Sequence, residues 1–173
     1  MRVINLIESV TRRAGWCGAV LIFPLVGALV YEVFSRYAFG RPTMWAFEIS
    51  YMVMGAMFML GMADTLRVGQ HVTVDVLSLQ LGDRSNAFIR LVGYALLLPV
   101  LGWLVWELSK YALTAFESNE QSGRSAWNPV IWPVFTVWFV GFLLLVLQVV
   151  AEVLKSLVIL LGRASAGEGG GKA

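Results

Sequence analysis

The chain has 173 residues, of which 58% are hydrophobic and only 14% are charged, and its mean hydropathy is +0.74. A soluble domain of this size needs more charged residues to cover its surface, so the composition indicates an integral membrane protein. The formal net charge of +2 is too small to indicate a nucleic-acid-binding protein. The single Cys17 excludes an internal disulfide and a cysteine metal cluster.

Four apolar segments are long enough to cross a bilayer, which takes roughly 20 helical residues. They lie at about 16–36, 45–66, 88–113 and 130–155. The sequence therefore predicts an all-α fold with a single four-span membrane domain over residues 1–162. The first segment is longer than the apolar core of a signal peptide and no A-x-A-like site follows it, so we interpret it as a retained anchor.

Two charged residues lie near the end of the first span. Glu32 and Arg36 are four residues apart, on one helical face and in the order that favours an ion pair. Two interpretations stay open: a local pair at the membrane rim, or an Arg36 that also reaches Glu48 on the second span.

The second span, WAFEISYMVMGAMFMLGMADTL, measures roughly 33 Å as a helix and carries an acid near each end. Glu48 follows Trp45 by three residues, so both lie on one face. The helix dipole favours an acid at this position. Glu48 could instead face another helix or a subunit, as ionisable residues within membranes usually do. A proton relay is a third interpretation, although no further acids extend a path across the span. At the other end, Asp64 and Arg67 are spaced for a local pair.

The segment after the second span, HVTVDVLSLQL, has two interpretations. Its valines alternate as in a strand, but its apolar residues also share a helical face, and Thr73 could cap that helix. A strand edge beside lipid would leave backbone groups unpaired, so we predict an interfacial amphipathic helix at about 73–81. This segment holds His71 and Asp75. A lone histidine lacks the further donors that a metal site needs, so we interpret His71 as structural or interfacial.

Small residues and a proline predict where the spans pack and bend. Pro99 lies in the middle of the third span and should kink it. Gly93 and Gly102 flank the proline and would allow another helix to approach. The first span holds small residues spaced by four, a pattern of closely packed membrane helices, at Ala14/Gly18 and Gly15/Ala19.

The fourth apolar pattern continues beyond the length of a span. From Val130 to Leu161 it would form roughly 48 Å of helix, more than the hydrocarbon core of a bilayer. We therefore predict a long fourth helix that tilts strongly or projects from the membrane. The final segment, 163–173, is rich in glycine and small residues, and we predict a disordered cytoplasmic tail there.

The positions of basic residues predict the orientation. Four spans place both termini and the middle connection on one side, which then carries nine of the thirteen Lys and Arg residues, against four on the other side. Cytoplasmic segments are enriched in Lys and Arg. We therefore predict that both termini are cytoplasmic.

The sequence lacks the residues that several kinds of chemistry need. One histidine excludes a bis-histidine haem, and no phosphate-binding glycine loop, HExxH or GxSxG sequence occurs. We predict no catalytic residue, no cofactor and no metal site. Four spans also leave little room for the two repeated halves that a self-sufficient secondary transporter usually has. A subunit of a larger membrane complex is the better interpretation.

The order and spacing of these features resemble the small membrane subunit, the DctQ type, of tripartite ATP-independent periplasmic (TRAP) transporters. The resembling parts are EVFSRYAFGRP, then MWAFEISYMVMGAMFMLGMADTLRVGQHVTVDVL, then a proline-bearing third span and SAWNPVIWPVF. The most specific piece is the W-x-x-E of Trp45 and Glu48 followed by H-V-T-V-D at His71 to Asp75.

The resemblance implies a four-span inner-membrane subunit that packs as a scaffold against a large multi-span permease, surrounded by lipid. A periplasmic binding protein would capture an organic acid, usually a carboxylate, and the large subunit would move it inward with sodium. Substrate and sodium sites would belong to the large subunit, so none is assigned to this chain. The resemblance marks the W-x-x-E and H-x-x-V-D positions, Trp45, Glu48, His71 and Asp75, as subunit-contact or helix-packing residues. Arg36 joins this set because it could reach Glu48 on the second span. The outer loops near 36–44 and 117–128 would lie where the binding protein docks.

Two other functions stay open. A free-standing small transporter or channel would form homo-oligomers and conduct without a partner. A membrane-bound redox subunit would carry a chromophore.

Overall fold

A computed structural model describes residues 2–69 and 83–168, and all of its regular elements in these ranges are helices. The helices are α1 (Arg2–Val20), α2 (Ile22–Ala38), α3 (Ala46–Arg67), α5 (Asp83–Glu117) and α6 (Trp132–Glu168). Four helical stretches are long and apolar enough to cross a membrane, and α1 and α2 together form the first of them. The predicted all-α, four-span fold is thus confirmed.

The first spanning stretch is one helix interrupted by a single residue. Leu21 keeps helical dihedral angles, and its N–H is shared between the carbonyl oxygens of Cys17 and Gly18. Pro24 explains this break, because it has no N–H for the carbonyl of Val20 and its ring crowds that residue. The helix also begins at Arg2, well before the apolar segment expected from about residue 16.

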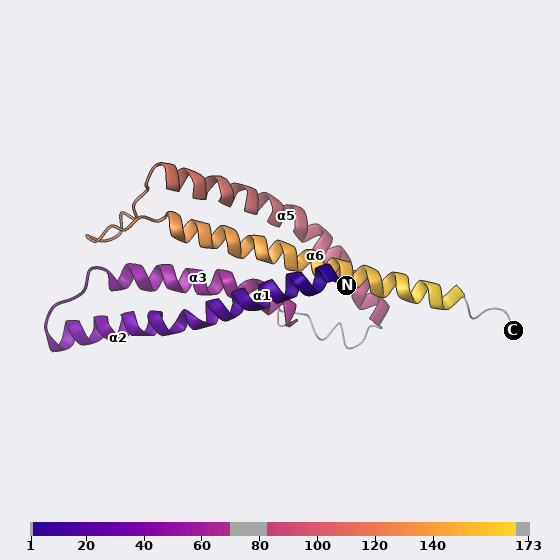
Figure 1. Cartoon of the computed structure of the whole chain (residues 1–173), viewed down its shortest axis with the longest axis horizontal. Coiled ribbons are helices and arrows are strands. Elements are labelled where there is room, and N and C mark those ends of the chain that lie inside the picture. Colours follow the sequence, from indigo (N-terminus) through magenta and orange to yellow (C-terminus); the bar gives the residue numbers. More distant parts are fainter. Residues whose placement is uncertain (1, 70–82, 169–173) are drawn as a thin grey trace.

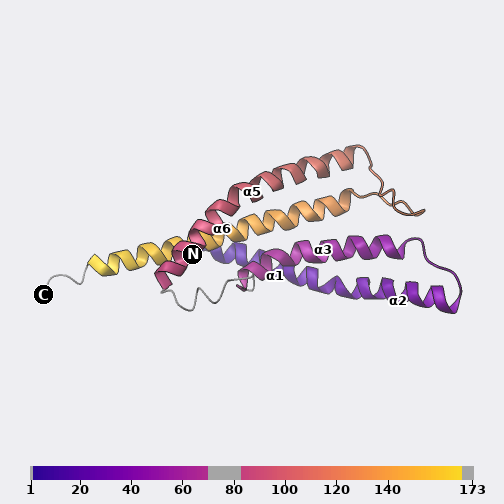
Figure 2. The same ribbon diagram turned by 180° about the vertical axis from the view of Figure 1, so that it is seen from behind.

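The helices lie side by side in an elongated array (Figures 1 and 2). Its order is α2, α3, α6 and α5, and α1 crosses near α3 and α6. The connections 39–45 and 118–131 lie at one end, called here the loop end. The start of α1 and the final turns of α6 lie toward the opposite end, called here the terminal end. Figure 1 also shows α6 extending past the other helices at the terminal end.

Close contacts at glycines bring α3 against its neighbours. A Cβ at Gly141 of α6 would lie only 2.6 Å from the Met59 carbonyl oxygen of α3. A Cβ at Gly15 of α1 would lie 2.7 Å from the Asp64 Cβ, so α1 and α3 also approach closely. The pairing of small residues in the first span therefore serves contact within this chain.

A core of apolar side chains fills the space around α6, which is the most buried of the four spans. Its buried members come from α3, α5 and α6: Ala63, Leu66, Leu101, Leu144, Leu145 and Val149. At the terminal end, Lys155 of α6 forms ion pairs with Glu8 of α1 and, at 2.7 Å, with Glu152 of its own helix. This network joins α1 to α6 beside the apolar core.

Helix α5 lies at an edge of the array and is the most exposed span. Only 6% of its most apolar stretch is buried inside the protein, against 33% for that of α6. It continues through Pro99 and curves along its length (Figure 2), because the proline has no N–H for the Ala95 carbonyl. Apart from the adjacent residues and the backbone of α5 itself, no described atom lies within 4 Å of a Cβ built at Gly93 or Gly102. The helix approach expected at these glycines therefore does not occur within the described residues.

Other predictions from the sequence agree with the structure only in part. The expected second span, 45–66, corresponds to α3. The expected boundary of the tail at residue 163 falls inside α6, which continues to Glu168, since Arg, Ala and Glu tolerate a helix. The predicted interfacial helix at 73–81 and residues 169–173 lie outside the described residues.

We predict that Gly141→Ala destabilises the protein by about 1–3 kcal/mol, because the added methyl group meets the α3 backbone. Gly102→Ala is the matched control, since it sits in a helix with free space around it. There the better helix propensity of alanine should leave stability equal or higher by up to about 1 kcal/mol. Thermal unfolding in detergent, followed by circular dichroism, measures both. Equal effects of the two substitutions would contradict the close α3–α6 contact.

Candidate functional site

The loop end carries the most organised polar structure outside the helices. In the 118–131 loop, the Ser122 N–H donates to the Pro129 carbonyl at 2.9 Å, and the Ile131 N–H donates to the Glu120 carbonyl at 3.0 Å. The Gly123 N–H donates to the Asn128 side-chain oxygen at 2.7 Å. These bonds tie the two arms of the loop together, so that it has a defined shape.

The turns of this loop use residues that tolerate a left-handed backbone. Asn119, Gly123 and Asn128 have φ angles of 50°, 64° and 45°. Glycine has no side chain to clash in this conformation, and asparagine is the side chain that adopts it most readily after glycine. The amino-acid choice at these positions therefore matches the shape of the loop.

Glu48 attaches this loop to α3. Its side chain is 1% exposed, and the Ser122 hydroxyl donates a 2.6 Å hydrogen bond to its Oε1 atom. The Oε2 atom is buried and has no hydrogen-bond partner within the described part of the chain. A hydrogen bond to a charged group is stronger than one between neutral groups, so this contact holds the loop against the start of the second span.

A second contact joins the same loop to the same helix. The guanidinium of Arg124 lies over the Tyr51 ring, 4.5 Å from its centroid. Tyr51 is three residues after Glu48, so both contacts lie on one face of α3. Beside them is a cavity of about 230 Å³. Its lining combines aromatic and charged side chains from α3, α5, α6 and the loop, among them Tyr51, Tyr111, Glu120, Arg124 and Phe135.

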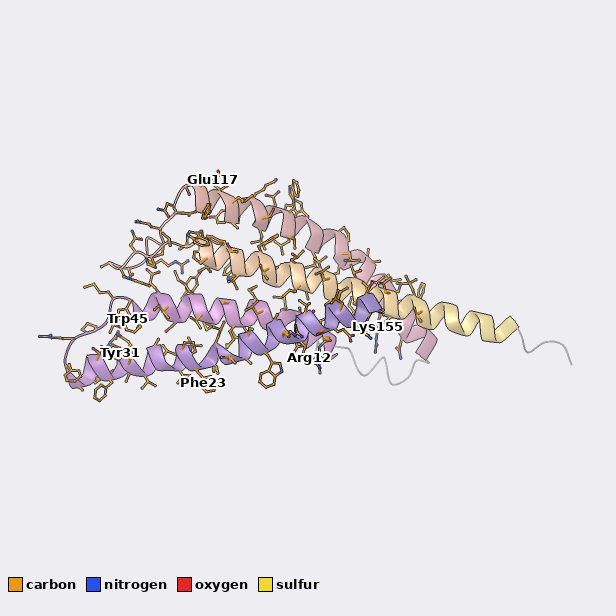
Figure 3. The ribbon with its side chains drawn as sticks, viewed as in Figure 1. Arg12, Phe23, Tyr31, Trp45, Glu117 and Lys155 are labelled. Atoms are coloured by element: carbon orange, nitrogen blue, oxygen red, sulfur yellow. The ribbon has the colours of Figure 1, made fainter. Side chains whose placement is uncertain are left out.

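Glu32 of α2 holds the 39–45 loop in the same way that Glu48 holds the 118–131 loop. Its carboxylate accepts hydrogen bonds from the Thr43 backbone N–H at 2.8 Å and from the Thr43 hydroxyl. Arg36 pairs with the other carboxylate oxygen at 2.5 Å. Trp45, which precedes α3, stacks on Tyr31 with the ring centroids 5.5 Å apart, and Figure 3 shows these two side chains together at the loop end.

The structure separates two residues that the sequence left as possible partners. Among the described residues, Arg36 forms its ion pair with Glu32 and none with Glu48. Glu48 instead binds a loop serine. His71 and Asp75 lie outside the described residues. At the other end of α3, the expected pair is present, with Arg67 Nε 2.7 Å from Asp64 Oδ1.

Sequence reasoning missed the loop residues that complete these contacts, Thr43, Ser122 and Arg124. Ser122 is 74 positions from Glu48, and no periodicity connects them. The asparagine and glycine residues of the loop are the one signal that could have indicated an ordered turn. Within the described residues, no group of three or more His, Cys, Asp or Glu side chains could hold a metal ion.

Comparison with known families decides the class of this protein. Residues 25–158 match the family model of the DctQ component of tripartite ATP-independent periplasmic transporters. The chain belongs to this family. The DctQ family is a family of transporter components and not of enzymes, which agrees with the four spans.

One curated relative is the sialic acid TRAP transporter permease protein SiaT of Haemophilus influenzae (strain 86-028NP). It is 27% identical over 96 residues, which cover 53% of this chain and 15% of the relative. The chain therefore corresponds to a small part of the length of that permease. No solved structure matches the chain.

We predict that Ser122→Ala loosens the 118–131 loop while the DctQ helices stay intact. Loss of a hydrogen bond to a charged group should speed backbone hydrogen exchange in this loop by about tenfold. Exchange measured by mass spectrometry on peptides covering 118–131 checks this. Ser118→Ala is the matched control, since the Ser118 hydroxyl donates to the Thr114 carbonyl in the last turn of α5 and not to Glu48. Unchanged exchange in Ser122→Ala would show that Glu48 does not hold the loop.

Proposed function

We propose that this DctQ-family chain scaffolds the large permease subunit of a TRAP transporter and helps to dock its periplasmic binding protein, for sodium-driven uptake of an organic acid. The observation that carries the docking proposal is the loop end, where Glu32 and Glu48 each hold a connecting loop in a defined shape. The family match supports the scaffold proposal.

The proposed orientation places the loop end in the periplasm of a bacterial inner membrane. The start of α1 and the end of α6 lie toward the same end of the array (Figure 1), as an even number of spans requires. Nine of the thirteen basic residues belong to that side, and cytoplasmic segments are enriched in Lys and Arg. Both termini are thus assigned to the cytoplasm.

The outward faces of the edge helices support a scaffold role. Large apolar side chains are exposed along α2, including Phe23 at 75%, which points away from the other helices in Figure 3. On α5, Leu96, Trp103 and Trp106 are similarly exposed. Lipid and a large permease subunit together would cover these faces. Apolar burial contributes roughly 25 cal/mol per Å², so these faces would keep the subunit fixed in the bilayer while a partner domain moves.

The curated relative supports a large partner. There, the segment similar to this chain makes up 15% of a protein that is itself named a permease. A DctQ-like segment in that protein is therefore part of a much longer transport chain. We propose that this chain forms the equivalent contact with a separate large permease.

Ordered loops support docking because a partner then meets a preformed surface and little entropy is lost on binding. The loop end carries exposed charges of both signs, with Arg41 in the first loop and Glu117 and Arg124 at the second. Such a surface suits a soluble protein that must bind, deliver its ligand and leave.

The proposed substrate class is an organic acid with a carboxylate. The name of the relative specifies sialic acid, which is itself a carboxylic acid. The substrate and sodium sites are assigned to the large subunit, and we propose no catalytic residue or cofactor in this chain.

Co-expression with a large TRAP permease subunit from the same organism tests the scaffold proposal. We expect the tagged chain to co-purify with the large permease in mild detergent. In liposomes with an inward sodium gradient, uptake of the organic acid should require this chain, the permease and the binding protein together. Full uptake without this chain would refute the proposal. Solute flux through liposomes that hold this chain alone would instead favour a free-standing channel or transporter.

The docking proposal has its own test in the same liposomes. We predict that Ser122→Ala raises the binding-protein concentration for half-maximal uptake about fivefold, because ordering the loop on docking costs about 1 kcal/mol. The maximal rate and the co-purified permease should stay unchanged, and Ser118→Ala should behave as the wild type. Unchanged half-saturation in Ser122→Ala would reject docking at this loop and leave the scaffold role standing.

A further inference from the structure

A polar pocket lies at the terminal end, far from the loops described above. It has a volume of about 130 Å³ and is formed by one face of α1 together with the last residue of α3. Its lining residues are Asn5, Glu8, Ser9, Arg12 and Arg67. The α1 members recur at helical spacing of three and four, so they form a continuous polar stripe that faces the end of α3.

Arg12 provides a positive charge that no described residue neutralises. Within residues 2–69 and 83–168, its guanidinium has no ion pair and no hydrogen bond. The acids around it are already paired, Glu8 with Lys155 and Asp64 with Arg67. Relative to the described residues, Arg12 is therefore available to bind an anion.

The depth of the pocket points to the lipid headgroups. Helix α3 has 22 residues, or roughly 33 Å, against a hydrocarbon core of about 30 Å. Arg67, its last residue, thus lies at the boundary of the core. The close contact of Gly15 with Asp64 places this part of α1 at the same level, and Figure 3 shows Arg12 away from the loop end that holds Trp45 and Tyr31.

The rest of α1 suits contact with lipid. Val3, Leu6 and Val10 are exposed on α1, at 44–66% of their surface. Trp16, one turn beyond Arg12, is also exposed, and tryptophan is enriched at membrane interfaces. Helix α1 therefore combines exposed apolar side chains with a polar stripe, as interfacial amphipathic helices do.

We propose that this pocket binds the phosphate of a phospholipid headgroup in the adjacent leaflet. The Arg12 guanidinium offers paired N–H groups that match two phosphate oxygens. The Ser9 hydroxyl and the Asn5 amide are further donors along the same stripe. The bound lipid would fix α1 against the end of α3. This inference does not depend on the proposed transport function.

Lipid retention by the purified full-length chain tests the inference. Native mass spectrometry, with dioleoylphosphatidylglycerol added to the detergent-solubilised protein, measures the bound fraction at each lipid concentration. We expect Arg12→Gln to weaken binding about tenfold, since a charged hydrogen bond is lost. Arg13→Gln is the matched control: Arg13 is adjacent, equally charged and exposed, but it does not line the pocket. Equal losses in the two variants would reduce the effect to general surface charge and overturn the site.

A second substitution tests the pocket without changing charge. Ser9→Phe places a large ring in the cavity and should also weaken lipid binding about tenfold, whereas lipid binding that survives it would overturn the proposal. Dioleoylglycerol, which lacks the phosphate, should bind weakly to the wild type. If millimolar inorganic phosphate displaces the lipid completely and binds as tightly, the ligand is a soluble anion and the lipid assignment is wrong. Circular dichroism confirms that all variants remain helical.

Discussion

The close contact between α3 and α6 at Gly141 is the constraint on which the rest of the arrangement depends. Because Gly141 has no side chain, α6 lies directly against the α3 backbone at Met59. The loop that leads into α6 is then carried over the start of α3. In that position, Ser122 reaches Glu48 and Arg124 reaches Tyr51. The same proximity assembles the apolar core of α3, α5 and α6. A single small residue thus contributes both to the packing of α6 on α3 and to the position of the loop that precedes α6.

The two acids near the loop end have a common role in this structure. A carboxylate inside a membrane protein must find donors, because burial without them is costly. Glu32 finds them in Arg36 and Thr43, and Glu48 finds one in Ser122. Each acid therefore ties a connecting loop to a span. Loops held in this way agree with the scaffold role that we propose for this DctQ-family chain.

Much of the architecture could be predicted because membrane spans are continuous apolar segments of the sequence. Segment 45–66 is apolar throughout, and α3 occupies almost the same residues. The local pairs Glu32–Arg36 and Asp64–Arg67 follow from helical spacing and are present. Hydropathy did not predict that α1 begins at Arg2. The first turns of this helix carry a stripe of polar residues, so they do not form a continuous apolar segment. The packing expected at Gly93 and Gly102 was also missed. A glycine permits close approach, but it does not determine which helix approaches.

The sequence by itself determined that this is a four-span membrane protein of the DctQ type, and it marked Glu48 and Arg36 as residues in need of partners. Both conclusions rest on local properties: the length of apolar runs, the spacing of charges along one helix and a motif read in order. Only the tertiary structure decided that Glu48 binds Ser122, that Arg36 stays with Glu32, and that α6 lies between α3 and α5. These contacts join residues far apart in the chain, and they depend on how closely two helices pack, which no single helix encodes.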